Sequence, residues 1–327
     1  MRAAVCRQFG PPESISVEDD FPAPTLAAGQ VRVRVAAAAV NFPDVLLAAN
    51  QYQLTVPVPF IPGSEFAGVI SEVGDGRAGF AVGMRVMGTV MVGAFAEEVV
   101  VAPRSLALIP PGVPAEAAAA FGVAHRTAYH ALRTIACALP GERLVVLGAG
   151  GGVGLAAVQL GAILGLDVTA VASSDAKLAA AASYGAARGI NHRAGDLRAA
   201  LRDAFPDGTD VVIDPVGGDL AEPALRSLRW AGRYVTIGYA AGSIPRIPLN
   251  LVMLKGCKVV GFQMRDLAAN APEAVGRDEA ELRELLASGR VTPHVGASFG
   301  LAEAATALRQ VAEGKAIGKV VLTLSAP

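Results

Sequence analysis

The chain has 327 residues, enough for about two domains of ordinary size. Hydrophobic residues make up 53% of it and charged residues 17%, which is ample for packed cores and excludes a disordered chain. The formal net charge is -1, and lysine and arginine form no run, which excludes a dominant basic surface for nucleic acid or membranes.

The three cysteines, Cys6, Cys137 and Cys257, are odd in number, far apart and never spaced C-x-x-C. This pattern argues against a disulfide framework and against a cysteine zinc site, and it fits a reducing cytoplasm. The first ten residues contain no apolar run of the kind found in signal peptides. We therefore expect a soluble, cytoplasmic protein.

The first third of the sequence is typical of β structure with many turns. Residues 31–35 alternate between valine and arginine, the pattern of a half-buried strand. Short apolar or alternating runs follow at 66–73, 84–90 and 95–101, separated by glycine and proline. Short strands with frequent turns predict a compact, largely antiparallel, barrel-like unit.

The pattern changes after Pro110-Pro111-Gly112, where strands and helices begin to alternate. We predict, in chain order, strand 143–147, helix 154–164, strand 167–172, helix 175–184, strand 210–213, helix 220–229, strand 233–237 and strand 257–260. Repeated strand-helix units predict a parallel sheet with helices on its faces. The tail has an amphipathic helix after Asp278 and a final strand at 319–324, which we expect to return to the first domain.

The segment Leu144–Leu166 also has the length of a membrane helix, because Gln159 is its one strongly polar side chain. Seven glycines interrupt it, however. A buried strand, a glycine turn and a buried helix explain the same residues better, so we expect no membrane span.

Five glycines in seven residues form the segment Gly148-Ala-Gly-Gly-Gly-Val-Gly154, between a predicted strand and its helix. A tight turn here would let a pyrophosphate reach backbone N–H groups at a helix N-terminus. The alternative is a glycine-rich turn without a ligand. The strand-turn-helix context favours a dinucleotide site, with Gly150, Gly151, Gly152 and Val153 as its residues.

The end of the next predicted strand distinguishes NAD from NADP. An NAD site usually has an acid there, whereas this chain has Ser173 and Ser174, followed by Lys177. Hydroxyl groups and an ammonium suit a 2′-phosphate, so we predict NADPH as the cofactor. Asp175 leaves two alternatives open: an acid that selects NAD, or a helix N-cap.

Ligands of parallel sheets bind outside the carboxyl ends of the strands. The predicted ends carry several glycines, which allow close approach of the backbone, although each one could be a simple turn glycine. The further cofactor residues predicted from these ends are Val216, Gly238, Tyr239 and Phe262.

Several motifs occur in a fixed order along nearly the whole chain. They are Asn41-Phe-x-Asp44, Pro62-Gly-Ser-Glu-x-x-Gly68, Thr127-Ala-Tyr-His-Ala-Leu132, Gly151-Gly-Val-Gly154, Ile247-Pro-Leu-Asn-Leu251, Leu254-Lys-Gly256 and Gly318-Lys-Val-Val321. With these motifs the chain resembles the medium-chain dehydrogenase/reductase superfamily, and within it the zinc-free, zeta-crystallin-like quinone oxidoreductase branch.

The resemblance implies an α/β fold of two domains and a homodimer. It implies a GroES-like, largely antiparallel β catalytic domain from residues 1–120 and 263–327. Residues 121–262 would form a Rossmann-type, doubly wound parallel-sheet domain that binds NADPH.

The resemblance also implies that no metal is bound. Zinc-dependent members have a cysteine at the position of Asn41 and a histidine at that of Ser64, and both are missing here. His125 and His130 are five residues apart, so they do not share one helix face. Tetrahedral zinc needs three or four protein ligands, so we expect no zinc site.

By the same resemblance, Asn41, Tyr52 and Thr127 line the nicotinamide and substrate site. Each could instead have a purely structural role, as a turn residue, a packing aromatic and a helix cap respectively. His192 would lie near the adenosine phosphate, although it could be a surface histidine, and Lys319 would face the cofactor.

Without a Lewis acid, hydride transfer to an unactivated ketone is difficult, whereas a quinone or enone spreads the developing charge itself. We therefore predict an NADPH:quinone oxidoreductase acting on small quinones or other α,β-unsaturated carbonyl compounds. One alternative is an enoyl-CoA or enoyl-acyl reductase on the same scaffold. The other is a non-catalytic NADPH-binding protein of structural or RNA-binding type, against which the neutral charge argues.

Overall fold

The computed structural model describes residues 1–75 and 79–324, and internal contacts divide the chain into two compact units. The first unit contains residues 1–123 and 292–327, and the second contains residues 124–291. Each unit has its own sheet and its own apolar core.

The first unit is built on a largely antiparallel sheet, as the sequence predicts. Its strand order is β14-β15-β3-β4-β5-β7, with β6 also paired to β3, and within it only β14 and β15 run parallel. Strands β1 and β2 form a separate antiparallel pair. The strands are β1 (Ala3–Cys6), β2 (Ile15–Glu18), β3 (Val31–Val40), β4 (Glu65–Val73), β5 (Arg85–Thr89), β6 (Glu98–Val101), β7 (Leu106–Leu108), β14 (Val295–Gly300) and β15 (Lys319–Thr323). The α-helices are α1 (Phe42–Ala48), α2 (Ala115–Ala119) and α11 (Ala304–Ala312), and the 3-10 turns are η1 (Pro12–Ser14), η2 (Pro103–Ser105) and η5 (Leu301–Glu303).

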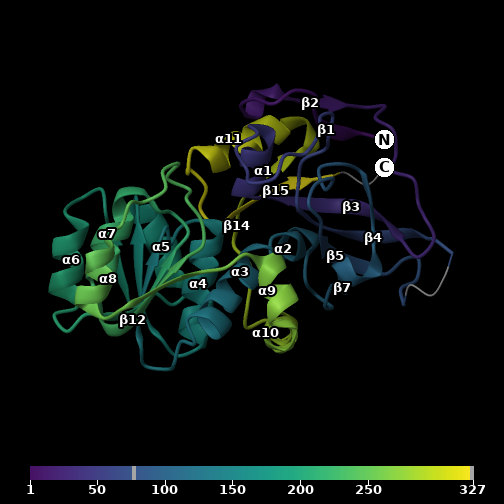
Figure 1. The fold of residues 1–327 in the computed structure, drawn as a ribbon. Coiled ribbons are helices and arrows are strands. Elements are labelled where there is room, and N and C mark those ends of the chain that lie inside the picture. The colour runs from purple at the N-terminus through teal and green to yellow at the C-terminus, as the bar shows by residue number, and fades with distance from the viewer. Residues whose placement is uncertain (76–78, 325–327) are drawn as a thin grey trace. The chain divides into compact units, whose positions relative to one another are not determined.

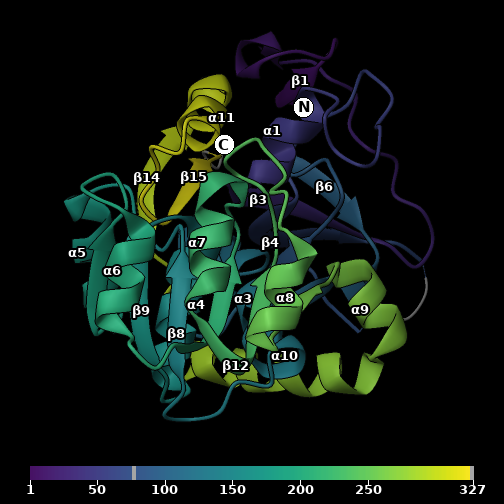
Figure 2. The same cartoon turned by 60° about the vertical axis from the view of Figure 1, so that its left-hand side comes forward.

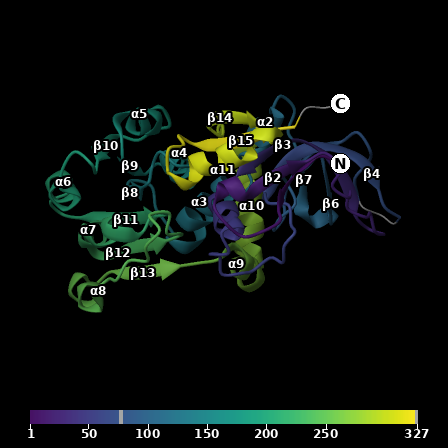
Figure 3. The same cartoon turned by 90° about the horizontal axis from the view of Figure 1, so that it is seen from above.

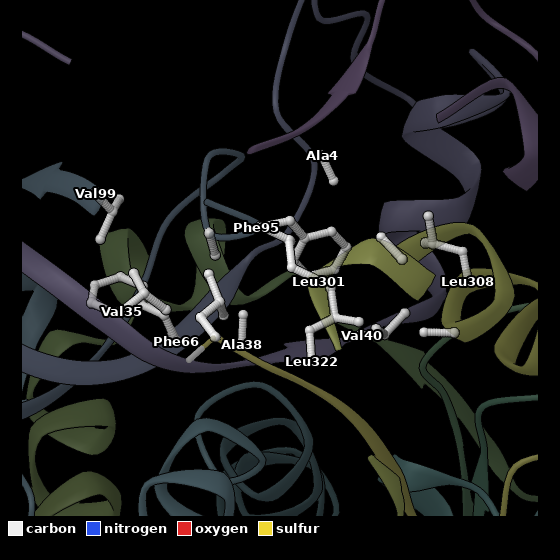
Figure 4. Packing of buried hydrophobic residues seen from close by; sticks show 14 of the residues in the cluster. Ala4, Val35, Ala38, Val40, Phe66, Phe95, Val99, Leu301, Leu308 and Leu322 are labelled. Atoms are coloured by element: carbon white, nitrogen blue, oxygen red, sulfur yellow. The ribbon is translucent and has the colours of Figure 1, made fainter. Parts of the chain in front are cut away.

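Strand β3 forms the centre of this unit because its alternating residues bury one face. In Figure 1 it lies beside β15, which follows it by more than 270 residues, and Val40 pairs with Val320. Figure 3 shows α11 next to β14 and β15. Phe66 and Phe95 are fully buried among aliphatic side chains, including Leu301 and Leu322 (Figure 4). The C-terminal strand therefore completes the first unit, as expected.

The second unit is a six-stranded parallel sheet of order β10-β9-β8-β11-β12-β13. The strands are β8 (Arg143–Leu147), β9 (Asp167–Ala172), β10 (Arg188–Asn191), β11 (Thr209–Asp214), β12 (Leu228–Thr236) and β13 (Lys258–Gly261). The helices are α3 (Ala124–His130), η3 (Ala131–Ile135, a π-helix), α4 (Gly152–Ile163), α5 (Asp175–Ser183), α6 (Leu197–Ala204), η4 (Gly218–Leu220), α7 (Ala221–Arg226), α8 (Leu249–Lys255), α9 (Met264–Asn270) and α10 (Pro272–Ala287).

Figure 2 shows β8 and β9 side by side among the helices, and β12 belongs to the same sheet. Together with the order of the strands, this confirms the predicted Rossmann-type sheet. The helix predicted at 220–229 is wrong at its end. The pairing of β12 with β11 begins at Leu228, which lies opposite Thr209. Helix α7 therefore stops at Arg226, and β12 is longer than predicted.

Residues 263–291 group with the second unit, whereas the sequence led us to expect them with the first. The cause is a set of ion pairs and hydrogen bonds between α3 and α10. His130 Nδ1 lies 3.1 Å from Asp278 Oδ2, and Tyr129 donates to Glu281 at 2.7 Å. Both His130 and Asp278 are buried, which anchors α10 to α3.

The apolar segment Leu144–Leu166 forms β8, the glycine turn and α4, as predicted. Across residues 1–75 and 79–324, none of the helices has the length and apolar character needed to cross a membrane.

Candidate active site

The glycine segment lies where the sequence placed it, between β8 and α4. Gly148 adopts a φ of +59°, and α4 begins at Gly152 with Gly151 as its N-cap. A Cβ on Gly154 would lie 2.1 Å from the carbonyl oxygen of Gly148, closer than any real contact. The loop therefore folds back onto the first turn of α4, and only glycine fits at 154.

Cationic side chains gather at the carboxyl ends of β9 and β10. The side chain of Lys177 packs over Gly150, where a Cβ would lie 2.5 Å from the Lys177 Cβ, and its Nζ lies 3.5 Å from Ser173 Oγ. Burial lowers the pKa of Lys177, and the charge of Arg193 lowers it further. Burial also lowers the pKa of His192, as do Arg193 and Lys177. Positive charges that repel one another beside a glycine loop form a site suited to a phosphate.

The structure assigns the helix cap that the sequence left open. Ser174 is the N-cap of α5, and its Oγ accepts from the Lys177 backbone N–H. Asp175 is the first residue of the helix, and its carboxylate accepts from Asn191 Nδ2 at 2.9 Å. Asp175 is therefore not the cap, and a neighbouring amide engages its carboxylate.

The other predicted strand ends differ in their distance from the glycine loop. Val216 lies against Gly148, since a Cβ there would be 2.5 Å from Val216 Cγ2. Gly238 and the half-exposed Tyr239 follow β12, and Tyr239 lies against Gly217. Phe262 follows β13 at the sheet edge, three strand spacings from β8, or about 14 Å. The structure thus brings Val216 to the loop and leaves Phe262 distant from it.

A buried polar cluster surrounds Asn41 in the first unit. Asn41 Nδ2 donates to Glu65 Oε1 at 2.9 Å and to Ser64 Oγ at 3.2 Å. The Lys319 ammonium donates to Asn41 Oδ1 at 2.5 Å, to Glu65 Oε1 at 2.7 Å and to Val40 O at 3.1 Å. Lys319 is 4% exposed and Glu65 1%, so this is a buried ion pair with satisfied hydrogen bonds.

We expected Lys319 to face the cofactor. In the structure its ammonium donates to three acceptors of its own unit. A cation therefore already lies beside Asn41 and Ser64. In the described part of the chain, His, Cys, Asp and Glu side chains do not form a group of three or more that could hold a metal ion.

Asp44 completes this cluster. Its Oδ2 accepts from the Asn41 N–H at 2.7 Å, and its carboxylate also interacts with the Ser64 side chain. Complete burial raises the pKa of Asp44 to about 7, although the Asn41 N–H and the charge of Lys319 oppose the shift. Asp44 is therefore largely protonated below neutral pH.

This pKa predicts a pH-dependent stability. The folded pKa is about 7, against about 3.9 in the unfolded chain, so the chain takes up a proton on folding and loses stability as the pH rises through 7. As the pH rises from 5 to 8, ionisation of Asp44 should lower the free energy of unfolding by about 2 to 3 kcal/mol. In Asp44→Asn this contribution disappears. Urea unfolding at several pH values measures it, with the exposed Asp19→Asn as control, and equal slopes in wild type and Asp44→Asn would refute it.

The remaining predicted residues divide between the units. Tyr52 is half-buried and packs against the core of the first unit. Thr127 belongs to the second unit and lies in the middle of α3, so it is not a helix cap. Sequence reasoning missed Arg193 and the roles of Asp44 and Glu65. Acidic residues next to buried strands were the available signal for the latter two.

Comparison with known proteins identifies the family. The Alcohol dehydrogenase GroES-like domain model matches residues 27–111, and the Zinc-binding dehydrogenase model matches residues 152–278. The bovine Quinone oxidoreductase-like protein 2 is 36% identical over 99% of this chain and 92% of its own length. Human Quinone oxidoreductase is 30% identical over 99% of this chain and 98% of its own length. The chain belongs to the zinc-free quinone oxidoreductase branch of the medium-chain dehydrogenase/reductase superfamily.

Solved structures agree with this membership of the quinone oxidoreductase branch. The Escherichia coli quinone oxidoreductase complexed with NADPH has a TM-score of 0.90 at 27% identity, covering 99% of this chain and 100% of that one. An enoyl reductase, CurK, has a TM-score of 0.87 at 26% identity, covering 99% and 98%. The fold of this chain is thus similar both to that of a quinone oxidoreductase and to that of an enoyl reductase.

Proposed function

We propose that this chain is an NADPH-dependent reductase that passes a hydride directly to quinones or related α,β-unsaturated carbonyl compounds without a metal. The cationic side chains of Lys177 and Arg193 beside the glycine loop, with His192 next to them, are the observation that supports it most. The NADPH named in the structure of the Escherichia coli relative fits this group. The three free cysteines fit a reducing compartment, and we propose the cytoplasm.

The cofactor would be held by the carboxyl ends of the parallel strands. The glycine loop would take the pyrophosphate, and Ser173, Lys177 and Arg193 the 2′-phosphate. Bound NADPH supplies the hydride. The protein would hold the nicotinamide ring and the quinone against each other and exclude water.

Lys177→Ala is expected to weaken the binding of NADPH but not that of NADH. Losing a charge-assisted contact to the 2′-phosphate should raise the KM for NADPH by about 10- to 100-fold and leave the KM for NADH within about threefold. Steady-state kinetics with both cofactors measures this. Lys315→Ala, an exposed lysine of the other unit, serves as control. An equal loss for NADPH and NADH would show that Lys177 does not recognise the 2′-phosphate.

On the substrate side we propose that Tyr52 and Thr127 supply the hydrogen-bond donors. The amide of Asn41 already donates to Glu65 and Ser64 and accepts from Lys319, so it is suited to shaping the site rather than to donating to a carbonyl. The anion formed from a quinone is aromatic and needs little further stabilisation, which fits a site without a Lewis acid.

An enoyl thioester is the alternative acceptor, and the similarity to the CurK enoyl reductase favours it. The rates of NADPH oxidation with 1,4-benzoquinone, 9,10-phenanthrenequinone and crotonyl-CoA distinguish the two. We expect the quinones to give the higher kcat/KM. Turnover with crotonyl-CoA alone would make the chain an enoyl reductase, and NADPH binding without any turnover would favour a non-catalytic binding protein.

We further propose that the chain forms a homodimer through the edge of the second unit. Strand β13 is the last strand of the sheet and pairs with β12 alone among the described strands. Around it lie exposed apolar side chains, with relative exposures of 80% for Trp230 and Leu249, 74% for Met253 and 70% for Leu254. A second copy could add its own β13 antiparallel, which would cover both the edge and the apolar side chains.

The double variant Trp230→Asp/Met253→Asp is expected to sediment as a monomer at a concentration where the wild type is a dimer. The reason is that burying two carboxylates in an apolar interface is costly. Analytical ultracentrifugation measures this. The control is Val82→Asp, which replaces an apolar residue of the first unit that is 65% exposed. A wild type that is monomeric, or a double variant that still dimerises, would exclude this interface.

A further inference from the structure

A buried carboxylate lies at the carboxyl end of β11, next to the glycine loop. Asp214 has no exposed surface. Its Oδ1 accepts from the backbone N–H groups of Val216 and Gly217, both at 2.8 Å. Its Oδ2 accepts from the hydroxyl of Tyr234 on the neighbouring strand β12. Asp214 therefore links β12 to the segment that leaves β11.

The conformation and contacts of this segment, residues 215–218, hold it in one position. Gly217 has a φ of +68°, and a Cβ there would lie 2.7 Å from the Tyr239 ring. Val216 O accepts from Ala241 N at 2.9 Å, which ties the segment to the loop after β12. Val216 also packs on Gly148, the first glycine of the dinucleotide loop. A shift of this segment would therefore move the wall of the cofactor site.

Tyr234 is suited to hold the carboxylate permanently. It is 2% exposed, and burial together with the charge of Asp214 raises the pKa of its hydroxyl far above the physiological range. Burial also raises the pKa of Asp214, while the hydrogen bonds from Tyr234, Gly217 and Val216 oppose the shift. Since a carboxylate without these donors would be costly to bury, the tyrosine and the two amides depend on one another.

We infer that Tyr234 and Asp214 are positioning residues for the cofactor: they hold Val216 and Gly217 in the place where NADPH binds, without touching it. This inference rests on the proposed function, since it concerns binding of NADPH. The inference distinguishes two possible effects of the Tyr234 hydroxyl, one on stability and one on NADPH affinity. A purely structural hydroxyl would affect stability alone, whereas a positioning hydroxyl affects NADPH affinity in the folded protein.

The test is the variant Tyr234→Phe in the full chain, with NADPH binding followed by fluorescence titration and turnover measured with 1,4-benzoquinone. Because one hydrogen bond to a charged group is lost, the Kd and KM for NADPH should rise about tenfold. At saturating NADPH, kcat should stay within about twofold, because bound cofactor restores the segment. The matched control is Tyr129→Phe. The Tyr129 hydroxyl, on α3 of the same unit, also donates to a carboxylate, that of Glu281 on α10.

Tyr234→Phe with wild-type affinity for NADPH would overturn the inference while leaving the proposed function intact. If the wild type itself does not bind NADPH, the proposed function fails first. Should Tyr234→Phe not fold by circular dichroism, Asp214→Asn replaces it. The asparagine retains an oxygen for the two amides but loses the charge, so a Kd for NADPH raised about threefold is expected. An unchanged Kd in folded Asp214→Asn would equally overturn the inference.

Discussion

Lys319→Met is expected to lower the free energy of unfolding by about 3 to 5 kcal/mol. Methionine keeps an unbranched apolar chain as far as Cε but removes the ammonium that donates to Glu65, Asn41 and Val40. Glu65 is 1% exposed, so its carboxylate would remain buried without its cation. The large cost therefore comes from the charge left behind rather than from lost packing.

Urea unfolding of the wild type and of Lys319→Met measures this effect. Lys315→Ala serves as the control, because its ion pair with Glu313 is exposed and should leave the stability unchanged. Removing both charges in Lys319→Met/Glu65→Gln should recover a part of the loss. A Lys319→Met protein within about 1 kcal/mol of the wild type would show that the ion pair does not stabilise the first unit.

The second large effect is expected from Gly154→Ala, which should weaken NADPH binding by about 100-fold or more. The added Cβ would lie 2.1 Å from the carbonyl oxygen of Gly148 and 2.9 Å from the Cα of Ala149. Both contacts are with backbone, so the glycine loop must move away from the first turn of α4. The N–H groups that would face the pyrophosphate then lose their arrangement.

Isothermal titration of NADPH into Gly154→Ala checks this expectation. Gly276→Ala is the matched control, because Gly276 also lies in a helix of the second unit and a Cβ there meets nothing within 4 Å. The control should bind NADPH as the wild type does. Comparable affinities of Gly154→Ala and Gly276→Ala for NADPH would mean that the loop does not carry the cofactor.

The regular part of the second unit could be predicted because its strands are continuous apolar runs. Residues 143–147 and 167–172 are buried along nearly their whole length, which leaves few alternatives. Strand β10 and helix α6 were not predicted. Strand β10, Arg188–Asn191, is a short edge strand with two polar ends and no fully buried residue, so it gives no apolar signal.

The candidate site could be predicted only in part. Asn41 and the glycine loop belong to local motifs, which a sequence displays directly. The contact between Asn41 and Lys319 joins residues 278 positions apart, and the pairing of β3 with β15 creates it. No local pattern indicates that such a lysine points inward. The same holds for Tyr234, whose partner Asp214 lies on a neighbouring strand.

Oxidation of NADPH in the presence of 1,4-benzoquinone, with and without EDTA and with NADH in parallel, tests the central claim most directly. We expect rapid turnover that EDTA does not change and a kcat/KM at least about tenfold higher with NADPH than with NADH. Absence of quinone turnover by a folded protein that binds NADPH, or turnover that EDTA abolishes, would contradict a metal-free NADPH:quinone oxidoreductase.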